Sequence, residues 1–142
     1  MSRALLVSGM AAAALSLVLG ARRTEPETAA PRVIEIVADH DSRFRINGQE
    51  TPTVTARAGE ALTLRFTARK AENRNRDGSI HGFALLRAKD RSKVPGWDFL
   101  LKPGVQEFAV TMPGEPGEYV AVCTVICSDD HEGMHMRFVV TP

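Results

Sequence analysis

The chain has 142 residues, which is enough for one domain but short for two domains of ordinary size. Hydrophobic residues make up 44% of the chain and charged residues 25%, proportions that argue against a wholly disordered protein. The formal net charge of +1 gives no basis for binding nucleic acid.

The first 23 residues have the features of a targeting segment. Arg3 precedes an uncharged and mostly apolar stretch, residues 4–21, and two arginines follow it. A short basic start, an apolar centre and small residues at the end are typical of a cleaved secretory signal. Because about 18–20 apolar residues can just span a bilayer, an uncleaved membrane anchor is the alternative. Either reading predicts that the rest of the chain is exported, to the periplasm or another extracytoplasmic location.

The composition changes after this segment. Residues 24–31 are small, polar and proline-bearing, as is typical of a linker. From residue 32 onward the sequence has the alternation and the β-branched content of strands. Strands are predicted within residues 32–40, 44–52, 53–70, 81–88, 105–112, 113–123 and 134–141. The second of these segments contains an Asn-Gly turn, and the third contains two runs that meet at Ala58-Gly59.

The connections between the predicted strands are polar or rich in Gly and Pro. Residues 71–80 are predicted to form a polar loop, and residues 90–104 an irregular connection with two Pro-containing turns. No ten-residue stretch after position 30 has a clear helical period. Seven or eight short strands with such turns indicate an all-β domain, an antiparallel Greek-key β-sandwich over residues 32–142.

One short stretch concentrates the side chains that can bind soft metals. Residues 123–136, CTVICSDDHEGMHM, contain both cysteines of the chain, two of its four histidines and two of its five methionines. Cys123, Cys127, His131 and Met134 follow the spacing C-x3-C-x3-H-x2-M between two predicted strands. Such a loop can turn several side chains toward one point, and the sheet beneath it fixes their geometry. His81, at the start of a predicted apolar strand, is the candidate for a further ligand.

Thiolate, imidazole and thioether ligands together match an electron-transfer copper site. Zinc is an alternative for two Cys and two His, but it leaves Met134 without a role. A disulfide between Cys123 and Cys127 is the other alternative in an exported protein. Such a bridge closes a loop of only three intervening residues, so it removes little chain entropy. It also leaves the neighbouring His and Met residues unexplained.

The motif CTVICSDDHEGM, together with His81 in the upstream sequence IHGF, resembles the binuclear copper A domain. This domain occurs in subunit II of haem–copper oxidases and in nitrous oxide reductase. The resemblance implies a cupredoxin fold over residues 32–142 and a site with two copper ions. It also implies that Cys123 and Cys127 bridge the two ions, and that His81 binds one ion and His131 the other.

The same resemblance implies two weak axial ligands, the thioether of Met134 and the backbone carbonyl of Val125. Three positions depart from the pattern of the respiratory family, which often has Glu at Val125, Gly at Ser128 and Asp at Gly78. A carbonyl ligand needs no particular side chain, so the first departure leaves copper binding intact. The departures indicate a protein other than a standard mitochondrial-type subunit II.

The expected function is that of an exported one-electron carrier with no substrate of its own, rather than an enzyme. Its expected partner is a redox protein such as a cytochrome or a terminal oxidase or reductase. The chain would be a free periplasmic carrier, or the electron-entry subunit of an oxidase if residues 4–21 remain as an anchor.

Two alternative functions stay open at this point. One is a copper chaperone or resistance protein, in which residues 131–136 capture the metal. The other is a mononuclear cupredoxin, whose ligands would be His81, Cys127, His131 and Met134.

Overall fold

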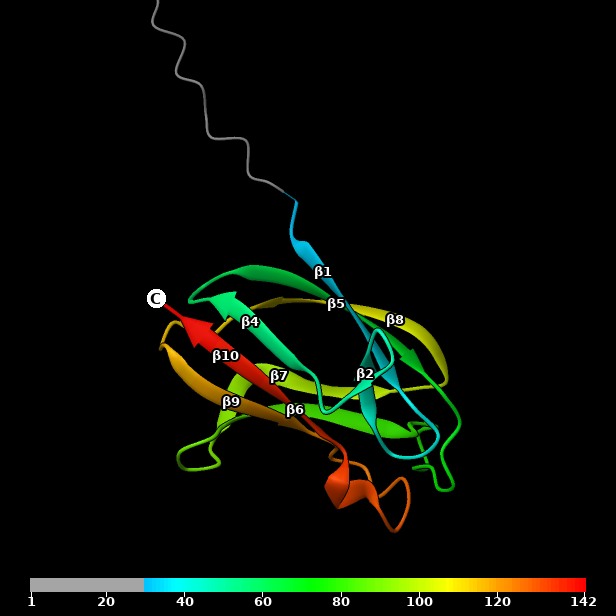
Figure 1. Cartoon of the computed structure of the whole chain (residues 1–142). Coiled ribbons are helices and arrows are strands. Elements are labelled where there is room, and N and C mark those ends of the chain that lie inside the picture. Colours follow the sequence, from blue (N-terminus) through cyan, green and yellow to red (C-terminus); the bar gives the residue numbers. More distant parts are fainter. Residues whose placement is uncertain (1–29) are drawn as a thin grey trace, which may run out of the picture.

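Two five-stranded β-sheets pack face to face in the computed structural model, which describes residues 30–142 (Figure 1). The first sheet contains, in spatial order, β3 (Gln49–Glu50), β2 (Phe44–Ile46), β1 (Arg32–Ala38), β5 (Ala61–Ala68) and β8 (Gly104–Thr111). The second contains β4 (Thr53–Arg57), β10 (His135–Thr141), β9 (Gly117–Val122), β6 (His81–Arg87) and β7 (Lys93–Leu101). The prediction of an all-β sandwich is confirmed. The predicted targeting segment 1–23 and most of the linker lie outside the described residues.

Period-two alternation explains how the strands form the core. In β5, Leu62, Leu64 and Phe66 are buried between the sheets, whereas the intervening Thr63 and Arg65 are partly exposed. Strand β6 differs because it is buried on both faces along nearly its whole length. It lies between β9 and β7, so the strand that begins at His81 is an interior strand of its sheet.

The expectation of a purely antiparallel sandwich is wrong for two strand pairs. Strand β1 runs parallel to β5, and β4 runs parallel to β10. The connection at Ala58-Gly59 passes from the second sheet to the first, so β4 and β5 do not pair with each other. Instead, β4 pairs with β10 and β5 pairs with β1. These partners come from distant parts of the chain, so a parallel arrangement is possible. Gly59 adopts a φ of +72° in this connection, a value that favours glycine.

The prediction of an irregular connection over residues 90–104 is also wrong, because residues 93–101 form β7. This strand lies at the edge of its sheet, where the missing N–H of Pro95 is tolerated. The register between β6 and β7 shifts between Ala84 and Leu86, and Gly96 has a φ of +78°. The irregularity interrupts the alternation of buried residues, which made the strand hard to detect in the sequence. With β7, and with residues 44–52 divided into β2 and β3, the described chain has ten strands.

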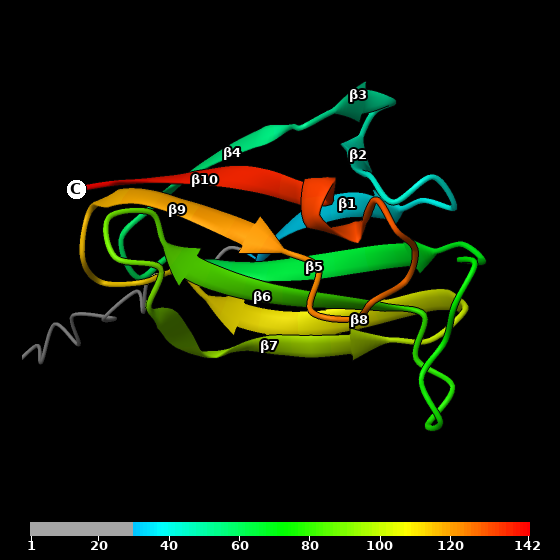
Figure 2. The ribbon, with the colours of Figure 1, turned by 90° about the horizontal axis from the view of Figure 1, so that it is seen from below.

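The connections that matter for function gather at one end of the sandwich (Figures 1 and 2). These are the turn after β1, the loop before β6 and the loop between β9 and β10, which contains the 3₁₀ turn η1 (His131–Gly133). The Asn47-Gly48 turn between β2 and β3 has the two positive φ values, 50° and 77°, that the sequence predicts for such a hairpin. Within residues 30–142 there is no helix of the length and apolarity that crossing a membrane requires.

Candidate metal centre

Neighbouring strands of the second sheet place the candidate ligands. His81 is the first residue of β6, and Cys123 directly follows the last residue of β9, the strand that pairs with β6. We call residues 123–134 the ligand loop. Its two ends are joined by a backbone hydrogen bond of 3.0 Å from the Cys123 N–H to the Met134 carbonyl. The loop is therefore anchored at both ends on a rigid pair of strands.

Three side chains form a compact buried cluster. One ligand atom from each of His81, Cys123 and Cys127 lies within 4.8 Å of the other two. The two Sγ atoms are 3.8 Å apart, and both cysteines are free thiols. His81 and Cys127 are completely buried and Cys123 is 9% exposed. The structure thus brings His81 together with two cysteines that lie 42 and 46 positions further along the sequence.

The imidazole of His81 is oriented as a metal ligand would be. Its Nε2 donates a hydrogen bond of 3.1 Å to the carbonyl of Arg69, which leaves the lone pair on Nδ1. Nδ1 is buried and has no hydrogen-bond partner among residues 30–142. Buried polar atoms are nearly always satisfied, and a ligand histidine usually donates its other N–H to a carbonyl or carboxylate. His81 therefore fits a metal ion at Nδ1.

The environment of the sulfur atoms also fits a cation. The hydrogen bond between the two thiols raises the pKa of Cys123 and lowers the pKa of Cys127. One thiol therefore keeps its proton when the other ionises, because two buried thiolates at this distance repel each other. A bound cation would hold both as thiolates. The Gly82 N–H donates to the Cys123 Sγ at 3.4 Å, and the Ser42 hydroxyl lies 3.5 Å from the Cys127 Sγ.

The carbonyl of Val125 points toward the cluster. It accepts the Cys127 N–H at 2.8 Å and lies 3.2 Å from the Cys123 Sγ. Val125 itself is 3% exposed, so the side chain anchors the loop while its carbonyl faces the sulfur atoms. This arrangement needs no particular side chain at the position.

The structure does not bring His131 into the cluster. His131 lies on η1 and is partly buried, and its Nδ1 is 3.1 Å from the carbonyl of Ser128. It lines a cavity of about 400 Å³ together with Cys123. Met134 is completely buried and directly precedes β10, and its role as a weak ligand stays a prediction. His135 is partly exposed and Met136 is buried, as alternation along β10 requires.

Sequence reasoning missed the supports on the first sheet, chiefly Ser42. This residue is 1% exposed and has a φ of 59° in the turn after β1. Its hydroxyl forms a 2.6 Å hydrogen bond with that of Ser128 and also contacts Cys127, which lies 85 positions away. Nothing in the local sequence distinguishes this serine from an ordinary turn residue. Only the packing of the two sheets places it under the ligand loop.

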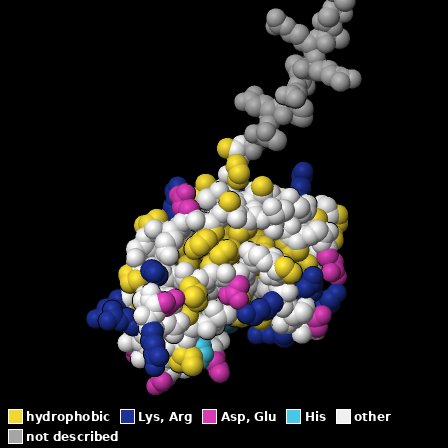
Figure 3. Space-filling model, turned by 180° about the vertical axis from the view of Figure 1, so that it is seen from behind, with side chains coloured by type: hydrophobic (Ala, Val, Ile, Leu, Met, Phe, Trp, Pro, Cys, Tyr) yellow, Lys and Arg dark blue, Asp and Glu magenta, His cyan; other side chains and the backbone are white. Residues whose placement is uncertain are grey.

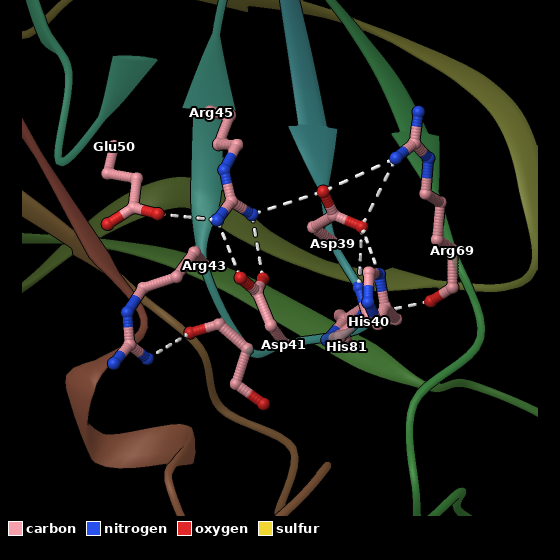
Figure 4. A network of polar contacts seen from close by, with 9 residues as sticks. Asp39, His40, Asp41, Arg43, Arg45, Glu50, Arg69 and His81 are labelled. Atoms are coloured by element: carbon pink, nitrogen blue, oxygen red, sulfur yellow. Dashed lines mark hydrogen bonds and ion pairs between the residues drawn. The ribbon is translucent and has the colours of Figure 1, made fainter. Parts of the chain in front are cut away.

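A second support reaches His81 through Arg69 (Figure 4). Asp39, which is 6% exposed, lies 3.4 Å from the Arg69 guanidinium, 3.1 Å from that of Arg45, and accepts hydrogen bonds from His40. The carbonyl of Arg69 in turn accepts the hydrogen of His81. Burial alone would raise the pKa of Asp39, but the hydrogen bonds from His40 and the charge of Arg69 together hold that pKa below its usual value.

Comparisons with solved structures identify the class of fold. The chain is similar to auracyanin A, a "blue" copper protein from the green thermophilic photosynthetic bacterium Chloroflexus aurantiacus, with a TM-score of 0.56 and 21% identity over 79% of this chain and 100% of that one. It is also similar to the copper protein rusticyanin, with a TM-score of 0.53 and 17% identity over 79% and 80% of the two chains. For auracyanin B the TM-score is 0.53 and the identity 20%, over 80% and 91%.

The chain therefore has the cupredoxin fold, as the resemblance in the sequence implied. Comparisons with protein-family models and with curated protein sequences find no match. At identities of 17–21% the structural likeness establishes the fold, and the function depends on the site itself.

Proposed function

We propose that the protein is an exported one-electron carrier that holds two copper ions in a copper A-type site. The observation that carries this proposal is the buried cluster of His81, Cys123 and Cys127, with two free thiols 3.8 Å apart. A mononuclear cupredoxin site needs one thiolate, and the second cysteine would then be an unexplained buried thiol. Two thiolates at this distance are suited to bridging a pair of soft metal ions.

The proposed roles of the ligands follow from the geometry and the motif. Cys123 and Cys127 would bridge the two ions, and His81 would bind one of them through Nδ1. The Val125 carbonyl, which points at the sulfur atoms, would be a weak ligand. Met134 would be the other weak ligand. His131 would bind the second ion, which requires it to exchange its contact with the Ser128 carbonyl for the metal.

Copper in such a site supplies one-electron redox chemistry, because thiolate and imidazole ligands suit both of its oxidation states. The chain's own contribution is to keep the ligands fixed and dry. The ligand loop is anchored at both ends, and the cluster is almost completely buried. Hydrogen bonds from Gly82 and Ser42 offset part of the charge on the sulfur atoms. A rigid, water-free site changes little between oxidation states, which favours fast electron transfer.

The partner and the location follow as further parts of the proposal. A carrier with no substrate of its own needs a redox protein, such as a cytochrome or a terminal oxidase or reductase. The targeting segment supports an extracytoplasmic location. The protein would contact a membrane only if residues 4–21 remain uncleaved as an anchor.

A mononuclear cupredoxin is the second candidate, and two observations favour it. Auracyanin A is described as a "blue" copper protein, and His131 lies outside the compact cluster. In this case Cys127 would be the sole thiolate ligand, with His81, His131 and Met134 completing the site. Cys123 would then be a buried thiol that does not bind metal.

Electron paramagnetic resonance with a copper count separates the candidates. An unpaired electron shared by two copper nuclei gives about seven hyperfine lines, against about four for a single copper. We expect about seven lines and two copper ions per chain in protein loaded with copper while the thiols are reduced. About four lines with one copper ion would replace the proposal with the mononuclear candidate. Weakly bound copper, or a disulfide without tight copper, would instead indicate a copper chaperone or resistance protein.

Two serine variants form a matched pair for the same measurement. If both thiolates bridge the metal ions, Cys123→Ser and Cys127→Ser should each abolish the shared-electron spectrum and lower the copper content from two ions per chain. If the site is mononuclear, Cys123→Ser should leave the spectrum and the copper content unchanged, and only Cys127→Ser should lose them. The two substitutions remove the same group from the same loop, so the comparison is independent of general effects on folding.

A further inference from the structure

A loop beside the metal centre has a strong positive charge that the proposed site does not use. Residues 69–76, RKAENRNR, contain four basic residues and one acidic residue, and we call this segment the basic loop. All of its residues except Ala71 are exposed. No ion pair involves Arg74 or Arg76 among the described residues, so their charges face the solvent.

The basic loop lies at the same end of the sandwich as the ligand loop, and the two run side by side in Figures 1 and 2. Figure 3 shows Lys and Arg side chains gathered at the lower left of the molecule, beside that end. Acidic residues at this end include Asp129, Asp130 and Glu132 on the ligand loop, Asp39 and Asp41 in the turn after β1, and Glu72 on the basic loop itself. Asp39 and Asp41 pair with Arg45 and Arg69. Lys70, Arg74 and Arg76 have no ion pair among the described residues, so the basic loop keeps a net positive charge.

Two hydrogen bonds to backbone carbonyls connect the basic loop to two of the proposed ligands. The Asn73 N–H donates to the carbonyl of Cys127 at 2.9 Å. The Arg69 carbonyl accepts the hydrogen of His81 Nε2 at 3.1 Å. An electron that reaches this loop therefore has a short path to the centre. The path consists of covalent bonds and hydrogen bonds within this chain.

The loop also encloses a hollow of about 630 Å³ that a partner's side chain can enter. Ala71, Ile80 and Pro103 supply apolar lining, and Lys70 and Arg74 supply positive charge. Glu72 is the acidic residue of the lining. An apolar centre with a charged rim is the usual anatomy of a protein–protein contact.

We infer that the basic loop is the docking surface for an acidic redox protein, which exchanges electrons with the centre through Arg69 and Asn73. The inference deepens the proposed function and relies on it for the electron path. The charge and the hollow are independent of the metal. Complementary charge raises the rate of encounter, and it does so most strongly at low ionic strength.

The first test uses a small anionic oxidant, hexacyanoferrate(III), with the reduced copper protein in a stopped-flow instrument. One electron passes from the protein to the oxidant, which becomes hexacyanoferrate(II), and no bond forms or breaks. At low ionic strength we expect Arg74→Glu/Arg76→Glu to lower the second-order rate constant by about tenfold. With the cationic oxidant tris(phenanthroline)cobalt(III) the same variant should not be slowed.

The control variant, Arg57→Glu/Lys93→Glu, makes the same change of net charge at the other end of the sandwich. Arg57 ends β4, which runs parallel to β10 away from the ligand loop, and Lys93 begins β7, whose last residue pairs with His81. We expect a change of less than about twofold with the anionic oxidant. Equal slowing in the two double variants would show an effect of total charge alone and would overturn the inference. An unchanged rate in Arg74→Glu/Arg76→Glu would overturn it as well.

The second test does not depend on copper. Titration of the metal-free protein with hexaglutamate, followed by ¹⁵N NMR, should shift the amide signals of residues 69–76, and added salt or Arg74→Glu/Arg76→Glu should abolish the shifts. Absence of these shifts, or equal shifts in the double variant, would contradict the docking surface. Failure of the proposed function would appear separately, as the absence of a copper signal in the resonance experiment.

Discussion

Gly82 illustrates how a single residue permits the metal centre to form. A Cβ atom at this position would overlap the Thr124 Oγ1 and lie 2.9 Å from the Thr124 backbone N. The absence of a side chain lets the ligand loop lie directly on β6, where the Gly82 N–H reaches the Cys123 Sγ. The glycine is required for close approach of two backbones, and its φ lies outside the left-handed region.

We therefore expect Gly82→Ala to displace the ligand loop. The substitution should lower the free energy of unfolding by about 1–3 kcal/mol, as overpacking does in other cores, and should weaken copper binding. Gly114→Ala is the matched control, because a Cβ there meets nothing within 4 Å. Urea denaturation of the three proteins measures the effect, and equal stability of Gly82→Ala and the wild type would contradict this role for the glycine.

The motif and its resemblance to the copper A domain predicted part of the centre at this scale. His81, Cys123 and Cys127 were recognised from the motif, and the structure brings their ligand atoms together. The carbonyl of Val125 was also recognised and points at the sulfur atoms. The role of His131 stays a prediction, because its ring contacts Ser128 rather than the cluster. Side-chain rotation on a short turn is decided by local contacts, which the spacing of residues does not encode.

At the scale of elements, the turn after β1 supports the metal centre from the opposite sheet. Asp39 holds the guanidinium groups of Arg69 and Arg45, and Ser42 contacts the ligand loop. The turn thus connects to both halves of the centre. It reaches His81 through Arg69 (Figure 4). It reaches Cys127 through Ser42. This support was not predicted, since Arg69, Cys127 and Ser128 lie 30 to 86 positions from the residues of the turn that they contact.

The buried carboxylate of Asp39 should make stability depend on pH. Because the pKa of Asp39 is lowered in the folded protein, its contribution is complete above the unfolded value of about 3.9 and is lost as the pH falls through the lower folded value. We expect Asp39→Asn to destabilise the protein by about 2 kcal/mol at pH 7. The difference from the wild type should shrink below about pH 4.

Asp98→Asn is the control for this experiment, because it removes an ion pair with Lys93 whose two side chains are about half exposed or more. Such a pair contributes about 0–1 kcal/mol, so its loss should change stability little at any pH. Urea midpoints of the three proteins between pH 3 and pH 7 provide the comparison. A gap between Asp39→Asn and the wild type that stays constant over this range would show that the carboxylate charge is not responsible.

Most strands were predicted from the sequence, but β7 was missed. Alternation identified β1, β5, β6 and β8 correctly. Strands β1 and β5 bury every second side chain, β6 is buried along nearly its whole length, and in β8 the side chains of Gln106, Phe108 and Val110 are buried or partly buried. In β7 the sequence Val94-Pro95-Gly96 reads as a turn, yet it forms part of an edge strand with a register shift. A sequence gives the preference of a residue for a turn, but the position of a strand in the sheet decides whether Pro is tolerated.

At the scale of the whole molecule, an aromatic cluster joins the two sheets beneath the metal centre. Phe83 of β6 is completely buried, and its ring lies 4.9 Å from that of Phe66 and 5.2 Å from that of Phe44, both on the first sheet. It also contacts Phe138 on β10 at 6.3 Å. Because Phe83 is two residues from His81, this packing also fixes the strand that supplies the buried imidazole.

We expect Phe83→Ala to lower the free energy of unfolding by about 3–5 kcal/mol, through lost burial and the cavity left between the sheets. Leu100→Ala is the control, since Leu100 is 48% exposed on β7 and its truncation should cost less than about 1 kcal/mol. Denaturant unfolding measures both. A cost below about 1 kcal/mol for Phe83→Ala would show that the sheets do not depend on this cluster.

The sequence by itself determined the class of fold and the chemistry of the donors. Period-two alternation specifies half-buried strands, and a short motif fixes which sulfur and nitrogen atoms share one loop, because both are local properties of the chain. The tertiary structure decided the parallel pairing of β1 with β5 and of β4 with β10, the strand at residues 93–101, and the supports at Ser42 and Asp39. These features depend on which segments meet across the sandwich, and such long-range contacts are set by the packing of two whole sheets rather than by the preference of any one residue.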